Sequence, residues 1–357
     1  MNQEFSELDR LEDNETEEYE YSTSYKLNSY GIDFDVSGLV RRQEKKSIYL
    51  PDFQRNYVWN KVKASKFIES LLLGLPIPSV CLYKEEDNKH IIIDGFQRLE
   101  SIRLFYAGKF TDGSTFSLVS VDSSFAGKTI DDLDDEIRLR LDDTLIHATI
   151  VKAEDPQEQN YNAVYLIFER LNTGGVNLTP QEIRACVYHG SFQTLIENLA
   201  QDENFKKVLF ISSKRKKDQE IVLRLLALSE RYNLYTGNMK EFLNQFMDNN
   251  KNKNEKNFSF QIALFLKTFE ILSTLDSKIF RPSKMLSLAI LDAIFVGTYI
   301  AIEHNCIQDI EMYKTKVNNI VSRQDFIQFI ETGKTHHSQP LKERIRISIE
   351  ELKGSDG

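Results

Sequence analysis

Residues 91–102, IIIDGFQRLESI, join an apolar run to a polar turn whose groups could bind phosphate. Three β-branched isoleucines favour a buried strand, and the apolar residues after the turn recur at helical spacing. The strand would end at Asp94 and Gly95, and the helix would begin with Gln97 and Arg98. A helix N-terminus has unpaired N–H groups and a partial positive charge, which suit a phosphate. The same residues also suit a plain turn, in which Gly95 turns the chain and Asp94 caps the helix.

Two further polar clusters lie at the ends of apolar segments. The stretch LPDFQRNYVW (50–59) holds Gln54, Arg55 and the only tryptophan, Trp59. The stretch FERLNTGGVNLT (168–179) holds Arg170, Asn172, Thr173 and Gly174. Aromatic residues could simply wedge the first loop against the core, and paired glycines also make ordinary turns. No cluster matches the Walker A loop, because its GKS or GKT ending is absent.

The elements that must position these clusters are readable from periodicity and turn residues. Strands are predicted over 47–50, 79–83, 90–94 and 145–153, and helices over 61–74 and 95–107. The polar, acidic residues 110–143 are interpreted as a solvated face. From residue 157 onward only helices are predicted, and one begins with a capping box of Thr179, Pro180 and Glu182. The fold class is therefore α+β at the N-terminus, followed by an all-helical C-terminal part.

Composition and charge narrow the class of protein. Three distant cysteines fit neither a disulfide framework nor a zinc site, which favours a cytoplasmic setting. Residues 1–20 hold nine acids and one base, so they carry −8 of the −9 net charge. We expect residues 1–24 to be a disordered tail, unlike a signal peptide. The apolar run 285–302 contains Asp292, so it is interpreted as a buried helix rather than a membrane span.

Taken together, several stretches resemble one family. PDFQRNYVW, SLLLGLPIPSVCLY, IIIDGFQRL, FERLNTGGVNLTPQEIRACVY and KDQEIVLRLLAL occur in the order and spacing of the domain-of-unknown-function family 262. This family is the N-terminal domain of GmrSD-type, modification-dependent restriction systems and includes the sensing part of the defence protein SspE. The resemblance implies a ParB/sulfiredoxin-like domain over 25–190 and a helical domain over 191–357. It also implies a nucleoside triphosphate and Mg²⁺ as cofactors.

The resemblance assigns roles residue by residue. Asp94, Gly95, Gln97 and Arg98 match the family's DGQQR signature, whose first glutamine is Phe96 here. Asp94, Gln97 and Arg98 would be catalytic, and Asp94 would also hold the metal. The remaining nucleotide-binding positions would be Gly95, Gln54, Arg55, Arg170, Asn172, Thr173 and Gly174.

The implied function is that of a nucleotide-binding, NTP-hydrolysing sensor or regulatory subunit of an anti-phage restriction system. It would act on DNA with a separate nuclease, because the chain shows no plausible HNH nuclease motif, and a homo-oligomer remains open. The alternative is a non-catalytic DNA- or protein-binding module that uses nucleotide only as a switch. The basic runs 41–46 and 214–217 suit either DNA phosphates or a solvated helix flank.

Overall fold

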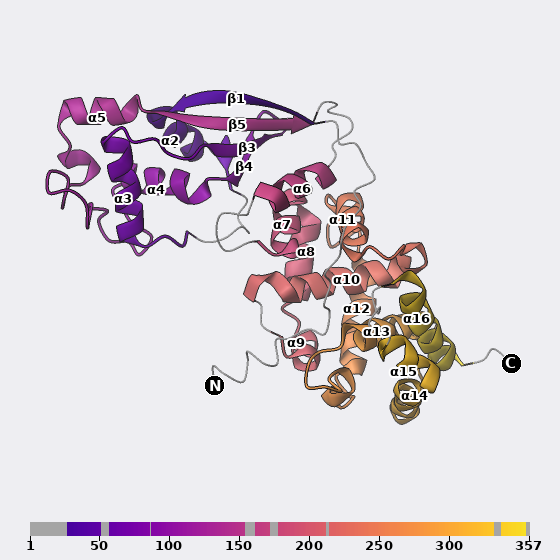
Figure 1. Cartoon of the computed structure of the whole chain (residues 1–357). Helices are drawn as coiled ribbons and strands as arrows, with labels where there is room; N and C mark the ends of the chain where they lie inside the picture. The colour runs from indigo at the N-terminus through magenta and orange to yellow at the C-terminus, as the bar shows by residue number, and fades with distance from the viewer. Residues whose placement is uncertain are drawn as a thin grey trace. The chain divides into compact units, whose positions relative to one another are not determined.

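The computed structural model describes residues 27–50, 57–85, 87–153, 161–171, 178–211, 214–331 and 337–354. The chain divides into two compact units, an N-terminal unit within Ser22–Leu178 and a C-terminal unit within Thr179–Gly357 (Figure 1). Several sequence-predicted features lie outside the described residues: the acidic tail 1–24, Gln54, Arg55, Asn172, Thr173 and Gly174.

The N-terminal unit is built on a mixed five-stranded sheet. Its strands are β1 (Leu27–Asp35), β2 (Ile48–Tyr49), β3 (Val80–Lys84), β4 (His90–Asp94) and β5 (Leu145–Ala153). They lie in the order β1-β5-β3-β4-β2. The β1–β5 and β3–β4 pairs are antiparallel, whereas β5–β3 and β4–β2 are parallel. The long β1–β5 pair is visible along one edge of the sheet in Figure 1.

Helices cover this sheet and complete its core. They are α2 (Val36–Glu44), α3 (Lys61–Leu72), α4 (Phe96–Tyr106), α5 (Asp135–Asp142) and α6 (Tyr161–Leu171), with the short η1 (Ile130–Asp132). In β5 the side chains of Ile146, Ala148 and Ile150 are buried and His147 is exposed, which confirms the predicted alternation. The acidic run before β5 is largely exposed, as expected, but Leu133 and Leu141 anchor it in the core.

Strand β1 and helices α2, η1 and α5 of this unit were not predicted. Strand β1 and helix α2 precede the first strand that the sequence pattern indicated. The β1 side chains are mostly exposed, because this strand lies at the edge of the sheet, so an apolar pattern is nearly absent. Its pairing with β5 over its full length depends on the distant partner strand.

The C-terminal unit is helical, as predicted. It contains α7 (Pro180–Val187), α8 (Ser191–Leu199), α9 (Glu203–Leu209), η2 (Lys214–Lys216), α10 (Lys217–Arg231), η3 (Tyr232–Leu234), α11 (Met239–Asn250), α12 (Ser259–Leu272), η4 (Ser277–Phe280), α13 (Leu288–Glu303), α14 (Ile310–Ser322), α15 (Gln324–Glu331) and α16 (Ser338–Lys353). The capping box of α7 is confirmed: the Thr179 hydroxyl accepts from the Glu182 N–H at 3.2 Å, and a Glu182 carboxylate oxygen accepts from the Thr179 N–H at 2.6 Å.

The apolar helix α13 is the centre of this unit. Asp292 is fully buried there and is paired with Arg224 of α10, whose Nε and Nη2 donate to its carboxylate at 2.8–3.0 Å. This pairing explains how a charge is tolerated in an apolar helix. Among the described residues, no helix is long and apolar enough to cross a membrane.

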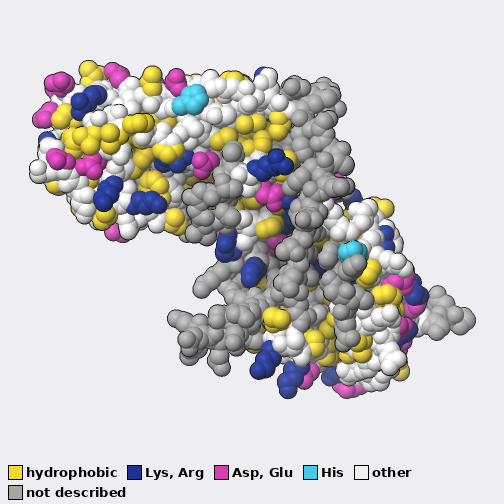
Figure 2. Space-filling model, in the orientation of Figure 1, with side chains coloured by type: hydrophobic (Ala, Val, Ile, Leu, Met, Phe, Trp, Pro, Cys, Tyr) yellow, Lys and Arg dark blue, Asp and Glu magenta, His cyan; other side chains and the backbone are white. Residues whose placement is uncertain are grey.

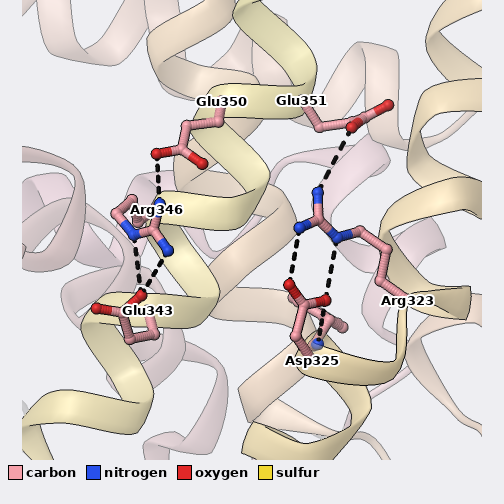
Figure 3. Close-up of polar contacts among 7 residues, drawn as sticks. Arg323, Asp325, Glu343, Arg346, Glu350 and Glu351 are labelled. Atoms are coloured by element: carbon pink, nitrogen blue, oxygen red, sulfur yellow. Dashed lines mark hydrogen bonds and ion pairs between the residues drawn. The ribbon is translucent and has the colours of Figure 1, made fainter.

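A surface ion network ties the end of the chain to its neighbours (Figure 3). Arg323 donates to Asp325 through Nε at 3.0 Å and through Nη2 at 2.7 Å, and its Nη1 lies 3.8 Å from Glu351 of α16. On α16 itself, Arg346 bonds Glu343 and Glu350. These pairs are solvent-exposed, so each contributes little to stability.

Candidate functional site

The turn between β4 and α4 strongly favours glycine. Gly95 has φ +95° and ψ 7°, in the left-handed region that L side chains rarely adopt. A Cβ at this position would lie 2.5 Å from Val80 Cγ1 and 3.2 Å from Arg98 Nη2. The backbone therefore passes directly over β3, and the space that a side chain would fill is already occupied.

The first turn of α4 is open at its N-terminus. Gly95 is the N-cap residue and supplies no side chain to bond the helix N–H groups. The alternative in which Asp94 caps the helix is wrong, because the Asp94 carboxylate instead accepts from Arg98 Nη2 at 2.9 Å. The partial positive charge of this helix end is thus left for an anion.

Arg98 is held in place beside that helix end. Its Nη2 also donates to the Ser79 carbonyl at 3.0 Å, so the residue before β3 fixes the guanidinium together with Asp94. The Arg98 side chain is 17% exposed and the Asp94 side chain is 51% exposed. Arg98 Nε is buried and has no hydrogen-bond partner among the residues that the structure describes.

Gln97 connects the Gly95 turn to the LPDFQRNYVW segment. Its Oε1 accepts from the backbone N–H groups of Val58 at 3.0 Å and Trp59 at 3.2 Å. One turn along α4, the Ser101 hydroxyl lies 2.6 Å from the Tyr57 hydroxyl. The described end of the LPDFQRNYVW segment is therefore attached to the start of α4, although about forty residues separate them. The side-chain oxygen of Gln97 therefore holds the loop that contains Val58 and Trp59.

Residues 168–171 of the FERLNTGGVNLT segment form the end of α6. Arg170 lies in the last turn of this helix and is exposed. Helix α6 packs against β4, the strand that ends at Asp94. The structure thus brings the helix before residues 172–174 to the strand that leads into the Gly95 turn, while residues 172–174 themselves lie outside the described part.

Electrostatics exclude a thiol nucleophile at this turn. Cys81 is the β3 residue opposite Asp94, and burial, with a smaller contribution from Asp94, raises its pKa to about 11. Burial likewise raises the pKa of Tyr57 to about 12. Both groups stay protonated at neutral pH, so Asp94 and Arg98 are the charged groups of the turn.

The side chains at this turn could bind Mg²⁺ only together with a substrate that supplies most of the metal ligands. Within the described ranges no three His, Cys, Asp or Glu side chains are grouped as a protein-only metal site. Asp94 offers a half-exposed carboxylate with one oxygen bonded to Arg98. Mg²⁺ commonly uses one or two carboxylates together with substrate phosphates and waters, and Asp94 fits this pattern.

Several groups of the site had no signal in the sequence. The Ser79 carbonyl and the Val58 and Trp59 N–H groups are backbone atoms, which any residue type would supply. Val80 reads as an ordinary core residue, yet its side chain is what excludes a Cβ at Gly95. Only the turn itself, with its acid, glycine, amide and guanidinium, was visible as a pattern.

Comparison with known proteins gives one match, to a family model that covers part of the chain. Residues 36–189, from α2 through α7, match the family described as GmrSD restriction endonuclease, N-terminal domain. Neither the curated proteins nor the solved structures contain a significant match. The matched residues include the Gly95 turn, Gln97 and the loop that Gln97 holds. The match supports a GmrSD-type N-terminal domain over residues 36–189.

Proposed function

We propose that the N-terminal unit is a ParB/sulfiredoxin-like domain that binds a nucleoside triphosphate at the β4–α4 turn. The protein would serve as the cytoplasmic sensor or regulatory subunit of a modification-dependent DNA restriction system and act with a separate nuclease. The observation that carries this proposal is the N-terminus of α4, which has no side-chain cap. It begins at a glycine whose positive φ and contact with Val80 disfavour any side chain, and Arg98 is fixed beside it.

Each group at the turn has a distinct task in this proposal. The N–H groups of the first turn of α4 would donate to phosphate oxygens, because the helix supplies them with no intrahelical acceptor. Arg98 would add a charge-assisted bond, and its guanidinium is already oriented by Ser79 and Asp94. Asp94 would hold Mg²⁺, which neutralises charge on the phosphates when bound.

The loops around the turn would form the rest of the nucleotide site. Gln97 would keep the LPDFQRNYVW loop in place, and with it Gln54 and Arg55. Arg170 at the end of α6 would also line the nucleotide site, together with the residues that follow the helix, Asn172, Thr173 and Gly174. These assignments rest on the family resemblance and on the packing of α6 against β4.

A second candidate is a nucleotide-dependent switch without turnover. One observation favours it. The side-chain Oε1 of Gln97 already accepts two backbone hydrogen bonds, so it holds a loop rather than orienting a water molecule. The preceding position, where the family signature has its first glutamine, is Phe96 and offers no polar group.

Binding can be tested by calorimetry with ATP or GTP and Mg²⁺ on the full chain. Arg98→Ala should weaken binding about ten- to hundredfold, because a hydrogen bond to a charged group contributes about 1.5–3 kcal/mol. The matched control is Arg103→Ala, which removes the same charge from α4 but breaks only a pair with Glu100. Equal affinity in wild type and Arg98→Ala, or an equal loss in both variants, would overturn the site.

Turnover is decided by phosphate release under the same conditions. Release by the wild-type protein that disappears in Asp94→Ala supports the enzyme. Binding without release supports the switch. Release that is equal in both proteins would contradict a catalytic role for Asp94.

A further inference from the structure

The C-terminal end of α9 gathers exposed cations and an exposed aromatic ring. Lys206 and Lys207 lie in the last turn of this helix and are both exposed. Phe210 follows directly, and its side chain is 55% exposed. In Figure 2 dark blue side chains stand out at the lower edge of the C-terminal unit.

The backbone of Phe210 is unusual. It has φ 46° and ψ 42°, and its N–H donates to the Lys206 carbonyl at 3.0 Å. This is the left-handed conformation in which many helices end, and it is unfavourable for a bulky residue. Core packing does not explain the conformation, because the ring stays largely in solvent.

A second segment brings more cations to the same place. Arg281 donates through Nη2 to the carbonyl of Leu209, the last residue of α9. Its backbone N–H bonds the Lys278 carbonyl at 2.9 Å, and its own carbonyl accepts from Lys284 N–H at 3.2 Å. Lys278 and Lys284 are both exposed. The turn after α12 is thereby fixed against the end of α9.

The four lysines of this surface have no close salt-bridge partner among the described residues. In the described part of the chain, Lys206, Lys207, Lys278 and Lys284 make no ion pair, and Lys206 bonds the neutral Gln201 side chain. The nearby acids Asp202 and Asp276 cap helices by accepting from Phe205 N–H and Lys278 N–H, and Asp218 interacts electrostatically with Lys206.

The basic run 214–217 differs in this respect. Arg215 pairs with Glu182 at 3.1 Å, and Lys216 pairs with Glu197 at 3.1 Å. These two cations stabilise contacts with α7 and α8. The run 214–217 is therefore a weaker candidate for contact with DNA phosphates than the end of α9.

We propose that Lys206, Lys207, Phe210, Lys278 and Lys284, here named the α9-end surface, bind single-stranded DNA. Phosphates release counterions when lysines neutralise them, which gives affinity without sequence preference. An exposed ring beside such cations can stack on an unpaired base, which a duplex does not offer. The proposal goes beyond the nucleotide site and requires no nucleotide.

The experiment uses the full chain without nucleotide and measures anisotropy of a labelled oligo(dT) of about 20 nucleotides, longer than the ~4–16 nucleotides that single-strand binding sites cover. A duplex of equal length is the comparison, and salt is varied. Lys206→Gln/Lys207→Gln and Lys278→Gln/Lys284→Gln should each lower the slope of log affinity against log salt by about 1.4. The control Lys256→Gln/Lys314→Gln removes two charges elsewhere in the unit and should leave the slope unchanged.

Phe210→Gly isolates the ring, because glycine adopts φ 46° without strain and the fold should be preserved. Affinity for the single strand should fall about tenfold, while weak duplex binding should stay the same. Arg98→Ala, which tests the nucleotide site, should bind DNA like the wild type. The proposal is overturned if the wild type does not bind oligo(dT), if the lysine variants behave like the control, or if Phe210→Gly binds the single strand unchanged.

Discussion

Gly95→Ala is the most direct test of how the β4–α4 turn is built. The added methyl group would lie 2.5 Å from Val80 Cγ1 and 2.9 Å from Val80 Cβ. Val80 is 1% exposed and belongs to the core, so it has little room to yield. The substitution therefore combines an unfavourable backbone conformation with overpacking.

The two costs can be separated by a second glycine. Gly108 also has a positive φ, +67°, but a Cβ there would meet nothing within 4 Å. Gly108→Ala should cost only the backbone term, about 1–2 kcal/mol. Gly95→Ala should cost about 1–3 kcal/mol more, because overpacking of a core contributes that amount. The lower entropy of the unfolded alanine chain offsets both variants equally.

Urea unfolding followed by Trp59 fluorescence measures this difference. Trp59 is the only tryptophan and lies in the N-terminal unit, so its signal reports that unit alone. Nucleotide affinity of Gly95→Ala, measured where the unit is still folded, should fall more than tenfold because the helix end shifts. If Gly95→Ala and Gly108→Ala unfold at the same urea concentration, the steric account of the turn is refuted.

Three other outcomes follow from buried or bridging groups. Gln97→Ala should cost about 1–2 kcal/mol and change Trp59 emission, since two N–H groups lose their acceptor; unchanged emission would contradict the bridge. Asp292→Ala should destabilise the C-terminal unit by about 3–5 kcal/mol in thermal unfolding, and Asp292→Leu with Arg224→Leu should recover most of that loss. Burial, followed by two nearby cations, lowers the pKa of His90. The unfolded chain then binds the proton more readily, so stability should fall as pH drops below about 6.5, less so in His90→Gln; a urea midpoint independent of pH would contradict this.

Local patterns were sufficient where the interacting groups are close in sequence. The capping box at Thr179 and Glu182 lies within four residues, and the Gly95 turn is contained in one short stretch. The buried helix α13 was identifiable from the apolar run 285–302, which contains only one acid, Asp292. In each case the side chains that define the feature are themselves the signal.

Long-range features gave no comparable signal. Strand β1 lies at a sheet edge with mostly exposed side chains, so its existence depends on hydrogen bonds to β5, more than a hundred residues away. The sequence left open whether the basic run 214–217 meets DNA phosphates or forms a solvated helix flank, and the structure pairs two of its cations with Glu182 and Glu197. Charge pairing of this kind is decided by packing.

The sequence by itself determined the fold class and the chemistry of the β4–α4 turn, because strand and helix periods and the residues Asp94 to Arg98 are local properties of the chain. Only the tertiary structure decided what surrounds that turn. The Ser79 carbonyl, the Val58 and Trp59 amides and the Val80 side chain reach it across the sheet and from separate loops. Backbone groups and core side chains are of the same kind everywhere in a sequence, so their role is set by which of them the fold brings into contact.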